Sequence, residues 1–114
     1  MVVEHHQETL AEIISIAQTI VNGKKVTVED LRKVVRLLRR TSYAEDKIFF
    51  PIISIEDDFD GYPLGQVRDN YEQKFLTHLD KETEETLIKM QPILIQTCKE
   101  IISKYGDKGS KGSG

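Results

Sequence analysis

The sequence predicts an all-α protein. Long segments carry apolar residues at the three- and four-residue spacing of amphipathic helices, Gly and Pro fall in a few clusters between them, and strand patterns are weak. The chain of 114 residues suits one domain with one core. We expect residues 1–105 to form this helical domain and residues 106–114, which are rich in Gly, Ser and Lys, to form a flexible tail.

The first helix is expected over residues 3–21. Its apolar residues recur every three or four positions and so share one face; they are Leu10, Ile13, Ile14, Ala17, Ile20 and Val21. Asn22-Gly23 follows directly, and these residue types tolerate the positive φ that commonly ends a helix. The helix should therefore end before this pair.

The second helix is expected over residues 27–53. Thr27 can cap its first turn, and Asp30 stands at the third helical position, a variant of the capping box with Asp in place of Glu. Apolar residues at helical spacing follow, namely Leu31, Val34, Leu38, Ile48 and Ile52. Pro51 is expected to bend or end the last turn.

The segment after the acidic linker 56–62 allows two interpretations. Pro63 fits the first turn of a helix, and apolar residues continue at helical spacing from Leu64 to Tyr105. One helix of roughly 40 residues would be about 60 Å long. The alternative is two helices that meet near residues 77–83. A single long helix leaves an apolar half that only a second chain covers, so it predicts a homodimer.

Composition excludes several classes of partner. The chain has 16 basic and 19 acidic side chains and a net charge of −3, which argues against a nucleic-acid surface built on overall basicity. No apolar run approaches the ~20 residues of a membrane span, and the N-terminus has no signal-peptide pattern. Cys98 is the one cysteine, so no internal disulfide forms, and a reducing, cytoplasmic location is the simplest expectation.

A carboxylate stands at a predicted core position of the second helix. Stepping along its apolar series by three and four residues places Glu45 on the inner face. A buried carboxylate must neutralise or find a cation. The same stepping on the other helices places further polar side chains on the inner face; they are His6, with His5 at its margin, Tyr71, His78 and Glu82.

Imidazole and carboxylate groups that converge inside a helical bundle are the ligands of non-haem di-iron sites, and imidazole also suits zinc or copper. The sequence therefore offers a metal site with these six residues as ligands. Each also has an ordinary interpretation: solvated histidines, an acidic surface run around Glu82, and a core aromatic at Tyr71. Glu45 can equally pair with Arg40, Lys74 or Tyr71 and bind no metal.

Several segments resemble motifs of the hemerythrin-like (HHE cation-binding) family. Glu4-His5-His6 is similar to the start of that family's first helix. The stretch 41–51, which ends in Ala-Glu-Asp-Lys-Ile-Phe-Phe-Pro, is similar to its second motif, and residues 61–72 to its third. His78 and Glu82 resemble the fourth motif more faintly. The resemblance implies an up-down helical bundle that holds non-haem iron, as a di-iron pair or as one metal ion.

The sequence departs from the family pattern at three places. Thr41 and Tyr71 stand where the family has ligand histidines, and only seven residues separate Tyr71 from His78, which is too few for a turn and a return helix. The bundle would then consist of three helices, with a long C-terminal helix that a partner chain completes. The ligand set would be reduced to His, Glu and Tyr.

Two functions follow as hypotheses. The first is a metal-binding protein of hemerythrin-like type, which implies oxygen or oxidant binding, iron handling or redox sensing. The second is a metal-free bundle that acts as an interaction or oligomerisation module through its C-terminal helix. An enzyme that uses Glu45 and Glu82 as acid and base is less favoured, because the chain shows no Gly-rich loop and no Ser/His/Asp set.

Overall fold

The computed structural model describes the backbone of residues 2–109 and the side chains of residues 7–106, and within this range the protein is helical with no strand. Four α-helices and three short 3₁₀ segments follow one another along the chain. They are α1 (Val2–Val21), α2 (Val28–Leu38), η1 (Ser42–Glu45), η2 (Lys47–Phe49), α3 (Phe50–Asp57), η3 (Gly65–Asn70) and α4 (Gln73–Gly109). The predicted all-α class is confirmed.

Helix α1 has the predicted extent and buries the predicted face. Gly23 follows it with φ 106°, a left-handed conformation that costs a glycine little and a side-chain-bearing residue more. The capping box at the start of α2 is also confirmed. Thr27 Oγ1 accepts the N–H of Asp30 at 3.1 Å, and Asp30 Oδ2 accepts the N–H of Thr27 at 3.0 Å.

The predicted helix over residues 27–53 is wrong in its second half. Helix α2 ends at Leu38 because Thr41 offers the backbone a competing partner: its hydroxyl accepts the N–H of Tyr43 and donates to the carbonyl of Leu38. Five residues later, the Asp46 carboxylate accepts the N–H of Ile48 at 3.0 Å. Two short 3₁₀ turns therefore replace two turns of α-helix. Pro51 then lies in the first turn of α3, where a proline favours a helix start.

The C-terminal segment forms one helix, although it starts later than predicted. Pro63 does not begin a helix. Gly65 has φ 65°, η3 follows, and Tyr71 is extended (φ −115°, ψ 151°), so α4 starts only at Gln73. At its other end α4 continues to Gly109, so the first four residues of the predicted tail are helical, and the remainder lies outside the described residues.

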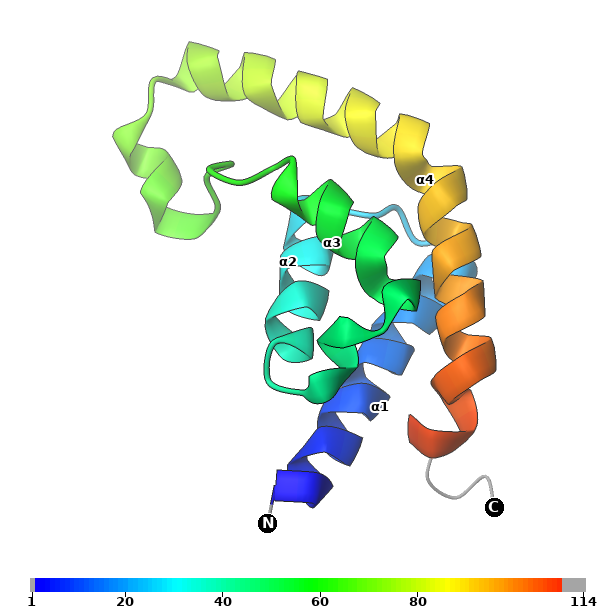
Figure 1. The fold of residues 1–114 in the computed structure, drawn as a ribbon. Helices are drawn as coiled ribbons and strands as arrows, with labels where there is room; N and C mark the ends of the chain where they lie inside the picture. Colours follow the sequence, from blue (N-terminus) through cyan, green and yellow to red (C-terminus); the bar gives the residue numbers. More distant parts are fainter. Residues whose placement is uncertain (1, 110–114) are drawn as a thin grey trace.

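Helix α4 is curved and has two halves with different surroundings (Figure 1). Its C-terminal half lies along α1, and it also contacts α3 and η2. Its N-terminal half extends over the end of the other helices. Pro92 lies within the helix, where its ring removes one backbone hydrogen bond, and a proline at such a position commonly bends the helix axis.

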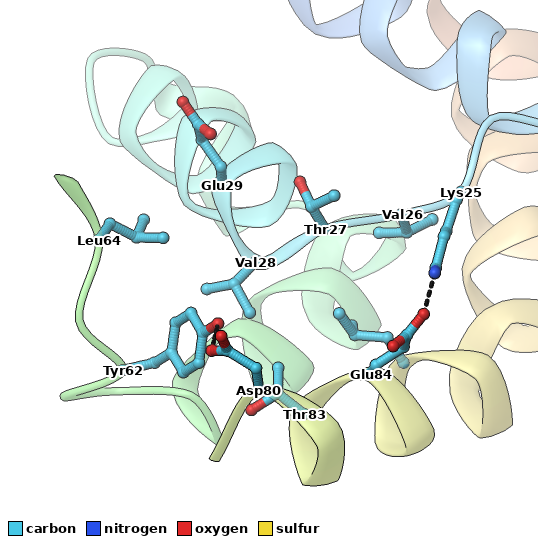
Figure 2. A pocket seen from close by; sticks show the side chains of 11 residues that line it. Lys25, Val26, Thr27, Val28, Glu29, Tyr62, Leu64, Asp80, Thr83 and Glu84 are labelled. Carbon is cyan, nitrogen blue, oxygen red and sulfur yellow. Dashed lines mark hydrogen bonds and ion pairs between the residues drawn. The ribbon is translucent and has the colours of Figure 1, made fainter. Parts of the chain in front are cut away.

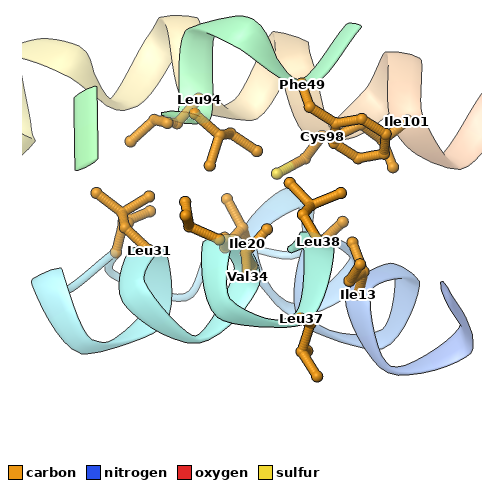
Figure 3. Close-up of a cluster of buried hydrophobic side chains, with 14 of the residues drawn as sticks. Ile13, Ile20, Leu31, Val34, Leu37, Leu38, Phe49, Leu94, Cys98 and Ile101 are labelled. Atoms are coloured by element: carbon orange, nitrogen blue, oxygen red, sulfur yellow. The ribbon is translucent and has the colours of Figure 1, made fainter. Parts of the chain in front are cut away.

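The core lies between α1 and α2 on one side and α3, η2 and the C-terminal half of α4 on the other (Figure 3). Its largest fully buried side chains are Phe49, Leu10, Ile13, Leu31, Leu38, Leu94 and Ile101. Each such side chain contributes about 1.5–3 kcal/mol through removal of apolar surface from water. Most of these residues belong to the predicted periodic series, but Phe49 does not: the predicted position was Ile48, which is only partly buried.

Cys98 belongs to this core. Its side chain is 1 % exposed, and burial raises the pKa of the thiol to about 11, because the thiolate would lose its hydration. At neutral pH the group is a protonated, unreactive thiol that fills space like a small apolar residue. It therefore has a structural role.

Candidate functional site

Glu45 does not occupy the core position that helical spacing predicted. Because α2 ends at Leu38, the residues after it do not continue the helical spacing. Glu45 is therefore an exposed residue at the end of η1. This segment lies at the opposite end of the fold from the N-terminal half of α4 (Figure 1). A solvated carboxylate needs no buried counterion, so the reason to place a cation beside Glu45 is lost.

The predicted ligands from the third segment are also on the surface. Tyr71 precedes α4 in extended conformation, so it does not share a helical stripe with His78. Its ring is 41 % exposed and stacks on Phe75 with ring centroids 5.7 Å apart. His78 Nε2 lies 3.2 Å from Glu82 Oε2, the predicted contact one turn apart, but both side chains are largely exposed.

The described side chains do not fit a di-iron centre. Among them, no group of three or more His, Cys, Asp or Glu residues is placed to hold a metal ion. The structure brings together His78 and Glu82 and leaves Glu45 and Tyr71 apart from them. His5 and His6 lie in α1, and their side chains are outside the described residues. A dinuclear site of the kind that four-helix bundles hold needs more ligands than one adjacent pair.

Asp46, the residue after Glu45, is the acid of this segment that contacts α4. Its carboxylate accepts hydrogen bonds from Lys104 Nζ at 2.5 Å, from the Tyr105 hydroxyl and from the Ile48 N–H. These donors, Lys104 foremost, lower the pKa of Asp46 from its ordinary 3.8 to about 2. The contact joins η2 to the last turns of α4. It is therefore a structural link between segments 58 residues apart.

A pocket of about 350 Å³ lies between the start of α2, the loop around Tyr62 and the N-terminal half of α4 (Figure 2). Val26, Val28 and Leu87 form its buried apolar part. Lys25 and Glu84 form an ion pair across it, and both side chains are half exposed. Helix α2 packs on α1 and α3, whereas α4 packs on α1, α3 and η2, so this pocket occupies the space where α2 and α4 face each other.

One wall of this pocket is a hydrogen-bonded cluster. The Tyr62 hydroxyl donates to Asp80 Oδ1 at 2.5 Å, and Arg68 Nη2 contacts Asp80 Oδ2 at 2.6 Å. Arg68, and then Tyr62, lower the pKa of Asp80, while desolvation and then Asp80 raise the pKa of Tyr62. The cluster fixes the loop before η3 against α4. No sequence pattern indicated this role of Asp80, because its partners come from a loop and a 3₁₀ segment 12 to 18 residues away.

The outward flank of α4 carries a second set of unusual residues. Phe75 is 47 % exposed and Ile93 is 50 % exposed, although both are large and apolar. Phe75 and Leu79 line another pocket, of about 240 Å³, whose opposite side includes Phe59 and the acidic residues Asp58 and Asp60. Phe75 and Leu79 belong to the predicted apolar series, but among the described residues Phe75 and Ile93 stay about half exposed.

The comparisons with known proteins add no family to this description. No helix in the described part of the chain has both the length and the apolar composition that a membrane crossing requires. The chain matches no protein-family model, no curated protein and no solved structure.

Proposed function

We propose that this protein is a self-association module, in which the N-terminal half of α4 pairs antiparallel with the same segment of a second copy. The observation that supports the proposal is a stripe of six residues along one face of the N-terminal half of α4. Its residues recur at spacings of four, three, four, three and four, the pattern of a helix-pairing seam. They are Phe75, Leu79, Glu82, Thr86, Lys89 and Ile93. All six side chains are exposed or half buried.

This seam is symmetric about residue 84, so it is complementary to itself. In an antiparallel pair with a two-fold axis there, Phe75 faces the partner's Ile93, and Leu79 faces the partner's Lys89. A two-fold interface requires such self-complementarity, because the same patch serves on both chains. The paired segment spans 19 residues, about 28 Å of helix at 1.5 Å per residue. Apolar residues at both ends would lose their contact with water.

Charge favours the same register. Lys89 has no ion pair with any described residue, and in the dimer it would lie one turn from the partner's Glu82. The partner's Lys89 would lie opposite Leu79. Leu79 lines the same pocket as Asp58 and Asp60, so these carboxylates would be near the lysine. Each basic side chain thus meets carboxylates of the other chain. Such pairing sets register and orientation more than it adds affinity.

Charge reversal tests the register. We expect the wild-type protein to show a monomer–dimer equilibrium with a micromolar Kd in analytical ultracentrifugation. Glu82→Lys and Lys89→Glu should each weaken it about tenfold, because each places like charges opposite one another twice in a symmetric dimer. The double variant should restore the wild-type Kd. Lys99→Glu, on the C-terminal half of α4, is the matched control and should leave the Kd unchanged.

The apolar contact is tested separately. Phe75→Ala removes the ring that would face the partner's Ile93, and we expect it to weaken the dimer by tenfold or more. A wild-type protein that is monomeric up to about 0.5 mM, where a micromolar dimer would be complete, overturns the proposal. So does a double charge variant that stays as weak as the single variants.

Metal binding is the second candidate function, and the His78–Glu82 contact at 3.2 Å is the observation that favours it. An imidazole and a carboxylate one helical turn apart can share one ion, but two ligands hold iron or zinc weakly. The hemerythrin-like resemblance also supports this candidate. His5 and His6 are the predicted ligands whose side chains lie outside the described residues.

Elemental analysis ranks the two functions. We expect untagged protein, produced in iron-supplemented medium, to carry well below one metal ion per chain by mass spectrometry, because the described residues supply no group of three or more metal ligands. One or more equivalents of iron, lost on His6→Ala and retained on His78→Ala plus Glu82→Gln, would place a site at the N-terminus. Iron lost in the His78→Ala plus Glu82→Gln variant would instead place the site on α4. Either outcome would raise metal binding to the first candidate.

A further inference from the structure

We infer that a pocket between α2 and α3 binds a phosphoryl group, either as inorganic phosphate or as the phosphate monoester of a small molecule. The pocket has a volume of about 230 Å³, and three arginines line it together with Val35 and Glu56. The arginines are Arg32, Arg36 and Arg39. None of these residues lies in α4, so the inference does not depend on the proposed dimer.

The arginines of this chain are concentrated at this pocket. Of the 16 basic residues, 11 are lysines spread along the chain and 5 are arginines, four of which lie within residues 32–40. A lysine serves equally well as a solvated surface charge or as a cation beside a helix C-terminus. The flat guanidinium group differs because it forms two parallel hydrogen bonds to a pair of phosphate or carboxylate oxygens. The concentration of arginine therefore favours an oxyanion as the ligand.

The three guanidinium groups share one face of α2, because spacings of four and three residues place side chains one turn apart. Arg36 and Arg39 are exposed, and neither makes an ion pair with a described residue. Lys33 of the same helix does have an acidic neighbour, since its Nζ lies 3.7 Å from Glu12 Oε2. Like charges one turn apart repel one another, so an anion between the arginines would stabilise this arrangement.

Arg32 is held in the wall of the pocket. Its Nη2 donates to the backbone carbonyl of Phe59 at 2.8 Å, and its Nε lies 4.0 Å from Glu56 Oε2, which is too far for a hydrogen bond. Among the described residues that line the pocket, Glu56 is the one acid. Three guanidinium groups against one carboxylate leave two positive charges in excess. A phosphate monoester carries about −1.5 to −2 at neutral pH, which matches this excess.

Titrations at constant ionic strength test the ligand class. In ¹H–¹⁵N correlation spectra at about pH 7.5, we expect inorganic phosphate and phenyl phosphate to shift the amides of residues 32–39 and of Glu56, each with a Kd of about 1–5 mM. Sodium chloride keeps the ionic strength constant. Phenyl sulfate has the same shape but a single charge, so it should bind at least about threefold more weakly. A lower Kd for phenyl phosphate than for inorganic phosphate identifies an ester as the ligand, and the reverse order identifies free phosphate.

Variants identify the groups responsible. Arg36→Gln plus Arg39→Gln should weaken phenyl phosphate at least about fivefold, because two of the three guanidinium groups are lost. Arg40→Gln is the matched control, since Arg40 is also an exposed arginine but does not line the pocket, and it should change the Kd less than about twofold. Glu56→Gln should strengthen binding about two- to threefold, because it removes a like charge beside the anion.

Two results would overturn the inference. One is a set of phosphate-induced shifts that do not saturate, or that do not exceed those of chloride at the same ionic strength, in a spectrum that shows the protein to be folded. The other is a loss of affinity in Arg40→Gln as large as that in the double arginine variant, which would show a response to net charge alone. The charge-reversal variants of the dimer seam leave both results unaffected, because Glu82 and Lys89 do not line this pocket.

Discussion

Phe49→Ala should lower the free energy of unfolding by about 3–5 kcal/mol, the range for truncating a fully buried aromatic side chain. Phe49 is 0 % exposed and stacks on Tyr105 with ring centroids 5.8 Å apart. This contact connects η2 to the last turns of α4. For a domain of this size the Tm should fall by at least about 12 °C.

Phe50→Ala is the matched control, because it makes the same change one residue later. Phe50 is 48 % exposed, so we expect a loss of about 1 kcal/mol or less. Urea denaturation followed by circular dichroism measures both. Equal losses of stability for the two variants would show that Phe49 and Phe50 are buried to the same extent, which would contradict this conformation of residues 46–50.

Asp46→Asn should cost about 1–2 kcal/mol at neutral pH, because it keeps an oxygen for the Ile48 N–H but removes the charge that Lys104 and Tyr105 contact. Glu45→Gln is the control. Since Glu45 is exposed on η1, we expect a change within about 0.5 kcal/mol. Chemical denaturation of the three proteins at pH 7 gives both numbers.

The pH dependence of this loss follows from the direction of the pKa shift. Folding lowers the pKa of Asp46 from 3.8 to about 2, so the folded state favours the charged carboxylate. Its contribution is complete above the unfolded pKa and is lost as the pH falls through the folded one. The stability difference between wild type and Asp46→Asn should therefore shrink between roughly pH 4 and pH 2. A difference that stays constant over this range would contradict the assignment.

The parts of the fold that were predictable from sequence depend on local signals. The capping box of Thr27 and Asp30 and the glycine after α1 act within a few residues, so sequence alone locates them. The periodic apolar residues of α1 and of the C-terminal half of α4 also bury as expected. In these segments local preference and tertiary contacts agree.

The segment between Leu38 and Phe50 was not predictable in the same way. Thr41 and Asp46 are compatible with a helix by spacing, and only the observed backbone shows that their side chains cap short turns instead. A change of phase by one residue moves a side chain to another face. This is why the acid that contacts α4 is Asp46, although helical stepping selects Glu45.

The candidate sites show the same limit. His78 and Glu82 meet as their spacing requires, because that contact lies within one helix. Tyr71 could not be placed, since the start of α4 depends on the loop that Arg68 fixes against Asp80. The pocket between α2 and α4 joins three segments and has no signature in any one of them.

The continuity of α4 has a consequence for the order of folding and assembly. Its core residues after Pro92, from Leu94 to Tyr105, are enclosed by the chain's own α1, α3 and η2. A monomer therefore has a complete interior before it meets another copy. If the copies pair as proposed, they do so through a helix that is already formed, and dilution should separate them without unfolding either chain.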